Sequence, residues 1–326
     1  MKHIYKYIKQ WHQEAWNLKY IIFILCFVFF GIFIEYSISL TTQIVDFSES
    51  SFMRFALFTL LFSFAYLIPL SADRWFNGNW KKKPDILFYM FIFIAVLTPS
   101  LDSAFSITKE FIMQFNHLPA SRIWFKKTGD NLIQSIILFI PALIFFLLLK
   151  SKNEKQSIGF KIKDINFKPY FYFLLFMVPP VISVSFLNDF RLSYPRLRLF
   201  FFLPSDQFSP IFQLVLFQAA YGLAFVSTEF FYRGFLILAA YKYLGMRSVI
   251  PAAVLYCFVH FQKPLLETIS SFPGGFLLGI ITAGSGSIIG GIIVHLGIAW
   301  SMEIAGFFQI FYRGDLLLEN LIRSRR

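Results

Sequence analysis

The chain has 326 residues, of which 57% are hydrophobic, 21% aromatic and only 15% charged, and its mean hydropathy is +0.63. A soluble domain is about 45–50% apolar and about 25% charged. The composition therefore excludes an ordinary soluble domain, a disordered chain and a coiled coil, and it favours a protein that crosses a membrane several times. Thirty basic and 18 acidic residues give a net charge of +12. Because Lys and Arg gather in the cytoplasmic loops of membrane proteins, we assign this charge to topology and expect no nucleic-acid partner.

The first apolar run follows a long basic segment, residues 1–19, and has no small-residue cleavage site, so it predicts a retained spanning helix and not a signal peptide. A helix that crosses the bilayer needs about 20 apolar residues, with a range of about 17–25. Candidate spans recur along the whole chain, and the predicted fold class is an all-α, polytopic integral membrane bundle of about eight transmembrane helices. The candidate spans are Tyr20–Leu40, Arg54–Ala72, Ile86–Leu101, Leu132–Leu149, Tyr170–Leu187, Pro210–Tyr241, Val249–Phe261 and Gly274–Glu303.

One span is interrupted. The run Gly284-Ser285-Gly286-Ser287 predicts a break in the last helix. Irregular backbone at membrane depth is tolerated only inside the protein or beside a cavity, so the break also points to a functional site. In the fifth span, Pro179-Pro180 predicts a kink.

The basic segment 150–168 divides the chain into an N-terminal membrane region, residues 1–168, and a C-terminal membrane domain, residues 169–326. With the N-terminus in the cytoplasm, the inside segments hold 16 Lys and Arg residues and the outside loops hold eight. This bias predicts a cytoplasmic N-terminus. The richness in Phe, Ile and Lys is typical of a bacterial inner-membrane protein. The two cysteines, Cys26 and Cys257, lie in apolar runs and are expected to be buried side chains, neither a disulfide nor metal ligands.

Few ionisable residues fall inside the apolar runs of the C-terminal domain, and each is a candidate site residue because burying a charge in a membrane is costly. Glu229 and Arg233 are four residues apart and therefore share a helix face, where they can neutralise each other. His260 lies in the seventh span, and His295 follows the predicted break. Each could be a packing residue, but two histidines beside an acid–base pair favour a shared polar site.

The order of these residues resembles that of the CAAX-prenyl endopeptidase and bacteriocin-processing family, also called Abi or CPBP. Its pattern is Glu-Glu-x-x-x-Arg on one helix, Phe-x-x-x-His on the next and His-x-x-x-Asn, or a similar residue, on a later one. This chain has Thr-Glu-Phe-Phe-Tyr-Arg at 228–233, Tyr-Cys-Phe-Val-His at 256–260 and His-Leu-Gly-Ile-Ala at 295–299. The resemblance covers about residues 212–303.

The resemblance implies an intramembrane endopeptidase that acts on a membrane-associated peptide or protein and needs no cofactor. In the family, the first Glu and the His of the second motif hold and activate a water molecule. His295 would donate a hydrogen bond to the oxyanion, and Glu229 and Arg233 match the residues that support the site. Two motif positions depart from the pattern. Thr228 stands where the water-activating Glu is expected, and Ala299 replaces the Asn.

These departures leave several functions open. The first is an active protease in which another carboxylate, with Glu229 foremost, serves as the base. Glu303 is more distant, since eight residues from His295 span about 12 Å of helix. The second is an inactive family member that binds membrane peptides as an immunity or scaffolding protein. A zinc protease that uses Glu229, His260 and His295 as ligands is a third, although Arg233 would compete for the Glu. A secondary transporter would show internal repeats, which the chain lacks.

Overall fold

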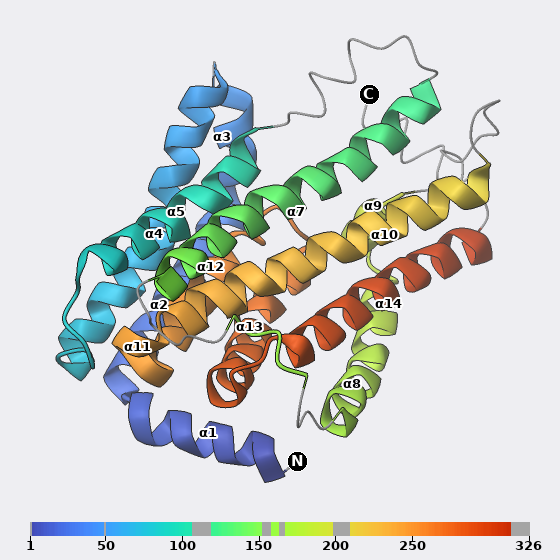
Figure 1. The fold of residues 1–326 in the computed structure, drawn as a ribbon. Helices are drawn as coiled ribbons and strands as arrows, with labels where there is room; N and C mark the ends of the chain where they lie inside the picture. The colour runs from blue at the N-terminus through green and yellow to red at the C-terminus, as the bar shows by residue number, and fades with distance from the viewer. Residues whose placement is uncertain are drawn as a thin grey trace. The chain divides into compact units, whose positions relative to one another are not determined.

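The structure is a computed structural model that describes residues 2–48, 50–105, 119–151, 158–162, 167–197 and 209–313. These residues form helices and turns and contain no strand. Figure 1 traces the helices in chain order. They are α1 (Lys2–Ala15), α2 (Leu18–Ile38), α3 (Leu40–Phe47), α4 (Ser51–Asn77), α5 (Ile86–Ala104), α7 (Pro119–Ser151), α8 (Lys168–Val184), α9 (Asn188–Ser193), α10 (Pro210–Glu229), η2 (Phe230–Ala239), α11 (Tyr241–Leu244), η3 (Gly245–Ser248), α12 (Val249–Phe258), α13 (Leu265–Ser285) and α14 (Ile289–Arg313).

Among the described residues, seven helical segments are long and apolar enough to cross a membrane. The polytopic all-α membrane architecture is therefore confirmed. Three of the eight predicted spans differ from these seven. The fifth is α8, whose 17 residues are one fewer than in the predicted span, the seventh is α12, a helix of only 10 residues, and the eighth is divided into α13 and α14.

The break in the last predicted span is confirmed, and it separates α13 from α14. Gly286, with φ of +67°, ends α13, a backbone conformation that favours glycine. The backbone groups freed at the break find partners in the segment 158–162. Ile288 N donates to Gly159 O at 2.9 Å, and Ser287 Oγ donates to Lys161 O at 2.7 Å. The break is thus satisfied by protein groups, as membrane depth requires.

The chain forms two compact units, each assembled from three separate segments. The first comprises residues 1–105, 134–165 and 227–291, and the second comprises residues 106–133, 166–226 and 292–326. The composition predicted two consecutive regions divided at residue 168. The two units are interleaved along the chain, and the division at residue 168 stays a prediction.

Aromatic rings enclose η2 in the first unit. The ring of Phe230 lies 4.6 Å from that of Phe139 and 5.8 Å from that of Phe146, both on α7, measured between ring centroids. Phe235 packs in the same way on Phe91 of α5 and Phe145 of α7, at 4.9 and 5.2 Å. All of η2 is buried. The helix that carries Arg233 is therefore fixed by aromatic packing on several sides.

Glycines allow α12 and α13 to pack closely in the same unit. A Cβ added to Gly279 would lie 2.9 Å from a methyl group of Val249 and 3.0 Å from one of Ile237, and a Cβ added to Gly275 would lie 3.0 Å from the ring of Tyr256. Small residues at helix contacts are the usual means of close packing in membranes.

The cysteine expectation is half right. Both thiols are free, and Cys257 is buried, but Cys26 is exposed. The reason is that α2 buries only a small part of its surface inside the protein, so an apolar sequence alone does not place a side chain in the core.

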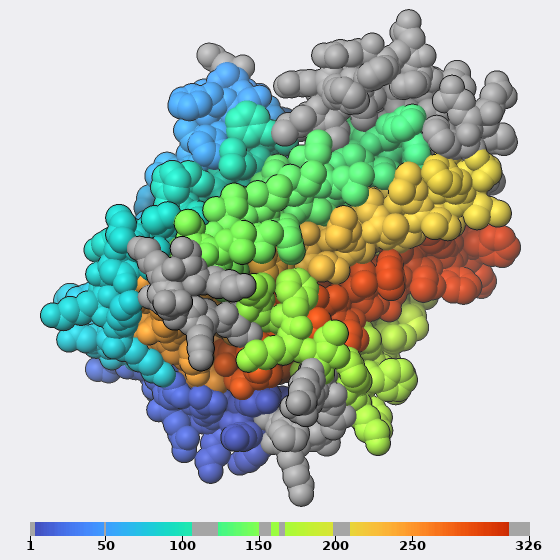
Figure 2. Space-filling model, in the orientation of Figure 1, coloured from blue at the N-terminus to red at the C-terminus, as the bar shows by residue number. Residues whose placement is uncertain are grey.

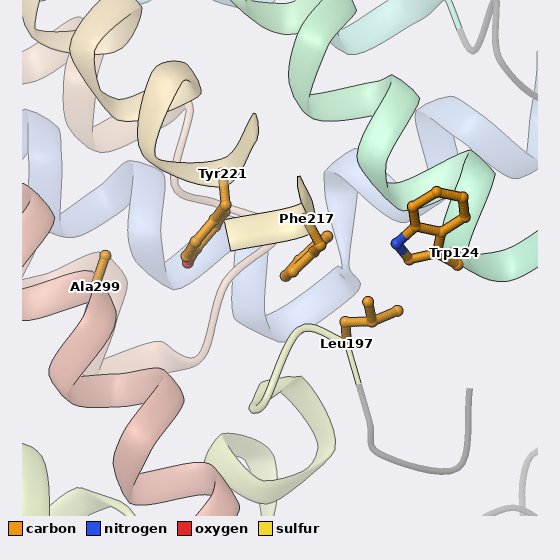
Figure 3. Packing of buried hydrophobic residues seen from close by; sticks show 5 residues of the cluster. All are labelled: Trp124, Leu197, Phe217, Tyr221 and Ala299. Carbon is orange, nitrogen blue, oxygen red and sulfur yellow. The ribbon is translucent and has the colours of Figure 1, made fainter. Parts of the chain in front are cut away.

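The second unit has its own apolar core, shown in Figure 3. Trp124, Leu197, Phe217, Tyr221 and Ala299 pack together there. The indole Nε1 of Trp124 donates to Gln213 O at 2.8 Å. Glu303, 2% exposed, accepts hydrogen bonds from the backbone N of Arg196 at 2.7 Å and from Nε2 of Gln218 at 3.3 Å. This carboxylate therefore anchors the turn after α9 to α14.

A buried ion pair joins the end of α4 to η3 in the first unit. Nε of Arg247 donates to both carboxylate oxygens of Asp73 at 3.0 Å, and its Nη2 reaches Asp73 O and Gly78 O. Asp73 is 1% exposed. Breaking such a pair from one side leaves a buried charge without compensation.

We therefore expect Arg247→Gln to lower the free energy of unfolding by about 3–5 kcal/mol, measured by denaturation of the purified protein in detergent. Lys82→Gln is the control, since it removes one partner of a pair whose side chains are 43% and 36% exposed and should cost less than about 1 kcal/mol. Equal losses in the two variants would contradict the assignment.

Candidate active site around Glu229, Arg233 and His260

The predicted acid–base pair is formed and fully buried. Oε1 of Glu229, the last residue of α10, lies 3.1 Å from Nη1 of Arg233, and the two side chains are 0% and 2% exposed. Two charges at this depth are costly unless they compensate each other. The pair is therefore a fixed element of the first unit and not a surface contact.

The backbone that carries Arg233 departs from the α-helix assumed in the sequence analysis. Residues Phe230–Ala239 form a π-helix. Such helices, with hydrogen bonds from residue i to i+5, are rare and usually confined to one turn, and they are frequent at functional sites. Nothing in the hydrophobic pattern predicted the wider turn.

The guanidinium of Arg233 lies over the ring of Tyr256, on α12. The guanidinium carbon lies 4.0 Å from the centroid of the Tyr256 ring, within the range of a cation–π contact. The ring of Tyr232 meets the same ring edge-on at 5.2 Å. Tyr256 stands at the Phe position of the second motif, which by itself indicates no functional role. Its position one turn before His260 was the signal that could have identified it.

His260 follows Tyr256 in space as well as in sequence. The two ring centroids are 4.4 Å apart, and Nδ1 of His260 lies 2.8 Å from the carbonyl oxygen of Tyr256. A carbonyl oxygen only accepts hydrogen bonds, so Nδ1 must carry the proton. In the neutral imidazole, Nε2 then has the lone pair and can accept a proton. The fold thus selects the tautomer of His260.

The backbone of His260 is held by a small group of hydroxyls. Thr268 Oγ1, on the first turn of α13, donates to the carbonyl oxygen of His260 at 2.6 Å. Tyr36 Oη of α2 lies 2.7 Å from Thr268 Oγ1 and donates to Lys263 O at 2.6 Å. The turn that carries His260 is therefore tied to two helices. Sequence reasoning missed Tyr36 and Thr268, because no short motif marks contacts between distant helices.

The first turn of α14 lies against the Glu229 carboxylate. A Cβ added to Gly291 would be only 2.3 Å from Oε2 of Glu229, so only glycine fits at this position without a shift. The N-terminal turn of a helix carries partial positive charge and backbone N–H groups, which favour a nearby carboxylate. No short motif in the sequence marks Gly291.

The third motif begins in the second unit. The ring of His295 packs edge-on against Phe225, with centroids 4.5 Å apart. Ala299, one turn later, is 4% exposed and lies in the apolar cluster of Figure 3. Since alanine carries no polar group, this position adds none to the helix face. A site shared by Glu229, His260 and His295 stays a prediction.

The remaining candidates have simple placements. Thr228 is partly buried, next to the fully buried Glu229. Glu303 is engaged in the second unit, as described above. Among the residues that the structure describes, no group of three or more His, Cys, Asp or Glu side chains is arranged to hold a metal ion.

Comparison with known proteins gives one family. Residues 210–301 match the family described as type II CAAX prenyl endopeptidase Rce1-like. The matched segment contains all three motifs and agrees with the region of resemblance found in the sequence. No curated protein and no solved structure matches the chain.

The contact between Gly291 and Glu229 gives a prediction on stability. Gly291→Ala should lower the free energy of unfolding by about 1–3 kcal/mol, since the added methyl group overfills a packed site. Gly274→Ala is the matched control: a Cβ there meets nothing within 4 Å, and the change should stabilise helix α13 by about 0.5–1 kcal/mol. Denaturation in detergent measures both. If Gly291→Ala stabilised the protein as the control does, the result would contradict the close approach of α14 to Glu229.

Proposed function

From the match of residues 210–301 to the type II CAAX prenyl endopeptidase Rce1-like family, we propose that the chain is a membrane-embedded endopeptidase. It hydrolyses a peptide bond of a membrane-associated protein or peptide. The observation that carries the proposal is the contact between Nδ1 of His260 and the Tyr256 carbonyl oxygen, which puts the lone pair of the neutral ring on Nε2.

His260 is the general base of the proposed reaction. It takes the place of the family's carboxylate, since position 228 is Thr in this chain. Nε2 takes a proton from a water molecule as the water oxygen attacks the carbonyl carbon of the peptide bond. The same nitrogen then gives the proton to the leaving amine as the carbon–nitrogen bond breaks. Nothing in this sequence of steps requires a group that the chain does not have.

Glu229 and Arg233 act as positioning residues. The Glu229 carboxylate faces Arg233 on one side and Gly291 on the other, which argues against its use as a free base. Arg233 lies over the ring of Tyr256, whose carbonyl oxygen holds His260. The pair therefore supports the base through one intervening residue. His295 is the proposed donor to the oxyanion.

A second function is favoured by one specific observation. Ala299 replaces the family's Asn and packs in an apolar cluster, so the donor expected at that position is lost. Losing one oxyanion donor costs about 10²–10³ in rate. The alternative is a family member that binds membrane peptides without cutting them, as an immunity or scaffolding protein.

The setting of the proposed activity follows from the sequence. We propose that the protein lies in a bacterial inner membrane with its N-terminus in the cytoplasm, as the distribution of Lys and Arg predicts. Its partners are then the lipid bilayer and a membrane-associated substrate.

The test is cleavage of a quenched fluorescent library of membrane peptides by the full chain in proteoliposomes. His260→Gln should lower kcat/KM by about 10²–10⁴, the usual contribution of a general base. His12→Gln, a change to an exposed histidine of α1, is the control and should leave the rate unchanged. Cleavage that survives His260→Gln would exclude His260 as the base.

The same assay separates the two functions. If the wild-type protein cleaves nothing and Thr228→Glu creates cleavage, the fold is that of a protease whose base is missing, and binding is the natural role. If wild type cleaves and Thr228→Glu adds little, His260 is sufficient as the base.

A further inference from the structure

Helix α1 has three distinct faces. Residues 4, 7, 11 and 15 form an inner stripe, residues 5, 8, 12 and 16 form an outer apolar stripe that ends one residue past the helix, and residues 6, 9 and 13 form a basic and polar stripe beside it. The spacing of three and four residues is that of one face of an α-helix. Each stripe faces a different environment.

The inner stripe is docked on the first unit. The indole of Trp11, 5% exposed, meets the ring of Phe276 on α13 edge-on at 4.8 Å. The ring of Tyr7 lies so close to Gly284 that a Cβ there would be 2.3 Å from it. Nζ of Lys81 binds Oε2 of Glu14 at 2.8 Å. The helix is therefore held in place, and its outer faces have a fixed direction.

The outer apolar stripe is uncovered. Tyr5 is 70% exposed, Ile8 40% and Trp16 48%. In the space-filling view of Figure 2, α1 lies at the edge of the molecule in dark blue, with side chains that project outward. Lys6 and Lys9, on the neighbouring stripe, are also exposed. Aromatic and aliphatic side chains next to lysines are the composition of helices that lie in a membrane interface.

Asn17 lies between α1 and α2 and connects both to the first unit. Oδ1 of Asn17 accepts from the backbone N of Lys19 and Tyr20, which caps α2, and its Nδ2 donates to Phe76 O at 3.0 Å. The first candidate membrane span begins at Leu18, and only residues 16 and 17 separate it from the end of α1. A docked helix at this point cannot move far from the lipid headgroups.

We propose that α1 binds the anionic phospholipid headgroups of the leaflet that α2 enters. Tyr5, Ile8 and Trp16 insert between the upper parts of the acyl chains, and the ammonium groups of Lys6 and Lys9 contact lipid phosphates. Charge complementarity selects this occupant, because the one acidic residue of α1, Glu14, is already paired with Lys81. The proposal does not depend on the proposed enzymatic function.

The test is hydrogen exchange of the α1 amides, with the full chain reconstituted as single copies in nanodiscs. One set of nanodiscs contains only phosphatidylcholine, and the other also contains phosphatidylglycerol. Exchange in residues 4–15 should be about 30-fold slower in the anionic bilayer, since each lysine near an anionic surface contributes roughly fivefold. High salt should remove the difference, because it screens exposed charges.

Two double variants make the result specific. Lys6→Gln with Lys9→Gln should abolish the lipid dependence, and Lys82→Gln with Lys83→Gln, which removes the same charge from the loop after α4, should keep it. Equal exchange in the two bilayers would overturn the proposal. So would protection that appears only when two copies share one nanodisc, because the occupant would then be a second chain.

Discussion

The ion pair between Glu229 and Arg233 is the constraint on which the candidate site depends. Two opposite charges with almost no exposure must keep their geometry, because separating them would leave an uncompensated charge in a medium that solvates it poorly. Several neighbouring helices hold the pair in this geometry. Rings from α5 and α7 pack around η2, Gly291 lets α14 approach the carboxylate, and Tyr256 receives the guanidinium.

The pair also bears on the proposed site, which has Thr228 where the family has a carboxylate. Arg233 contacts the ring of Tyr256, and the carbonyl oxygen of Tyr256 accepts from Nδ1 of His260. A base that is oriented by its own helix needs no acidic partner to choose its tautomer. The hydroxyls of Tyr36 and Thr268 hold the same turn from the other side. In the proposed enzyme, the charged pair is thus structural and the histidine carries the chemistry.

Much of this arrangement could be predicted from the sequence, since its signals are local. Apolar runs of about 20 residues predicted most of the spans, the Gly-Ser run predicted the break before α14, and the four-residue spacing predicted the Glu229–Arg233 contact. The π-helix, the cation–π contact of Tyr256 and the close approach of Gly291 could not be predicted, because each depends on the packing of helices that are distant in sequence.

The most direct measurement of the central claim is a double-mutant cycle on the unfolding free energy in detergent, with Glu229→Gln, Arg233→Met and the variant that carries both. Each single change should cost about 3–5 kcal/mol, because it leaves one buried charge alone. The double variant should cost clearly less than the sum, by at least about 1 kcal/mol, since it leaves no charge behind. Additive losses would mean that the two residues act independently, and they would contradict the account.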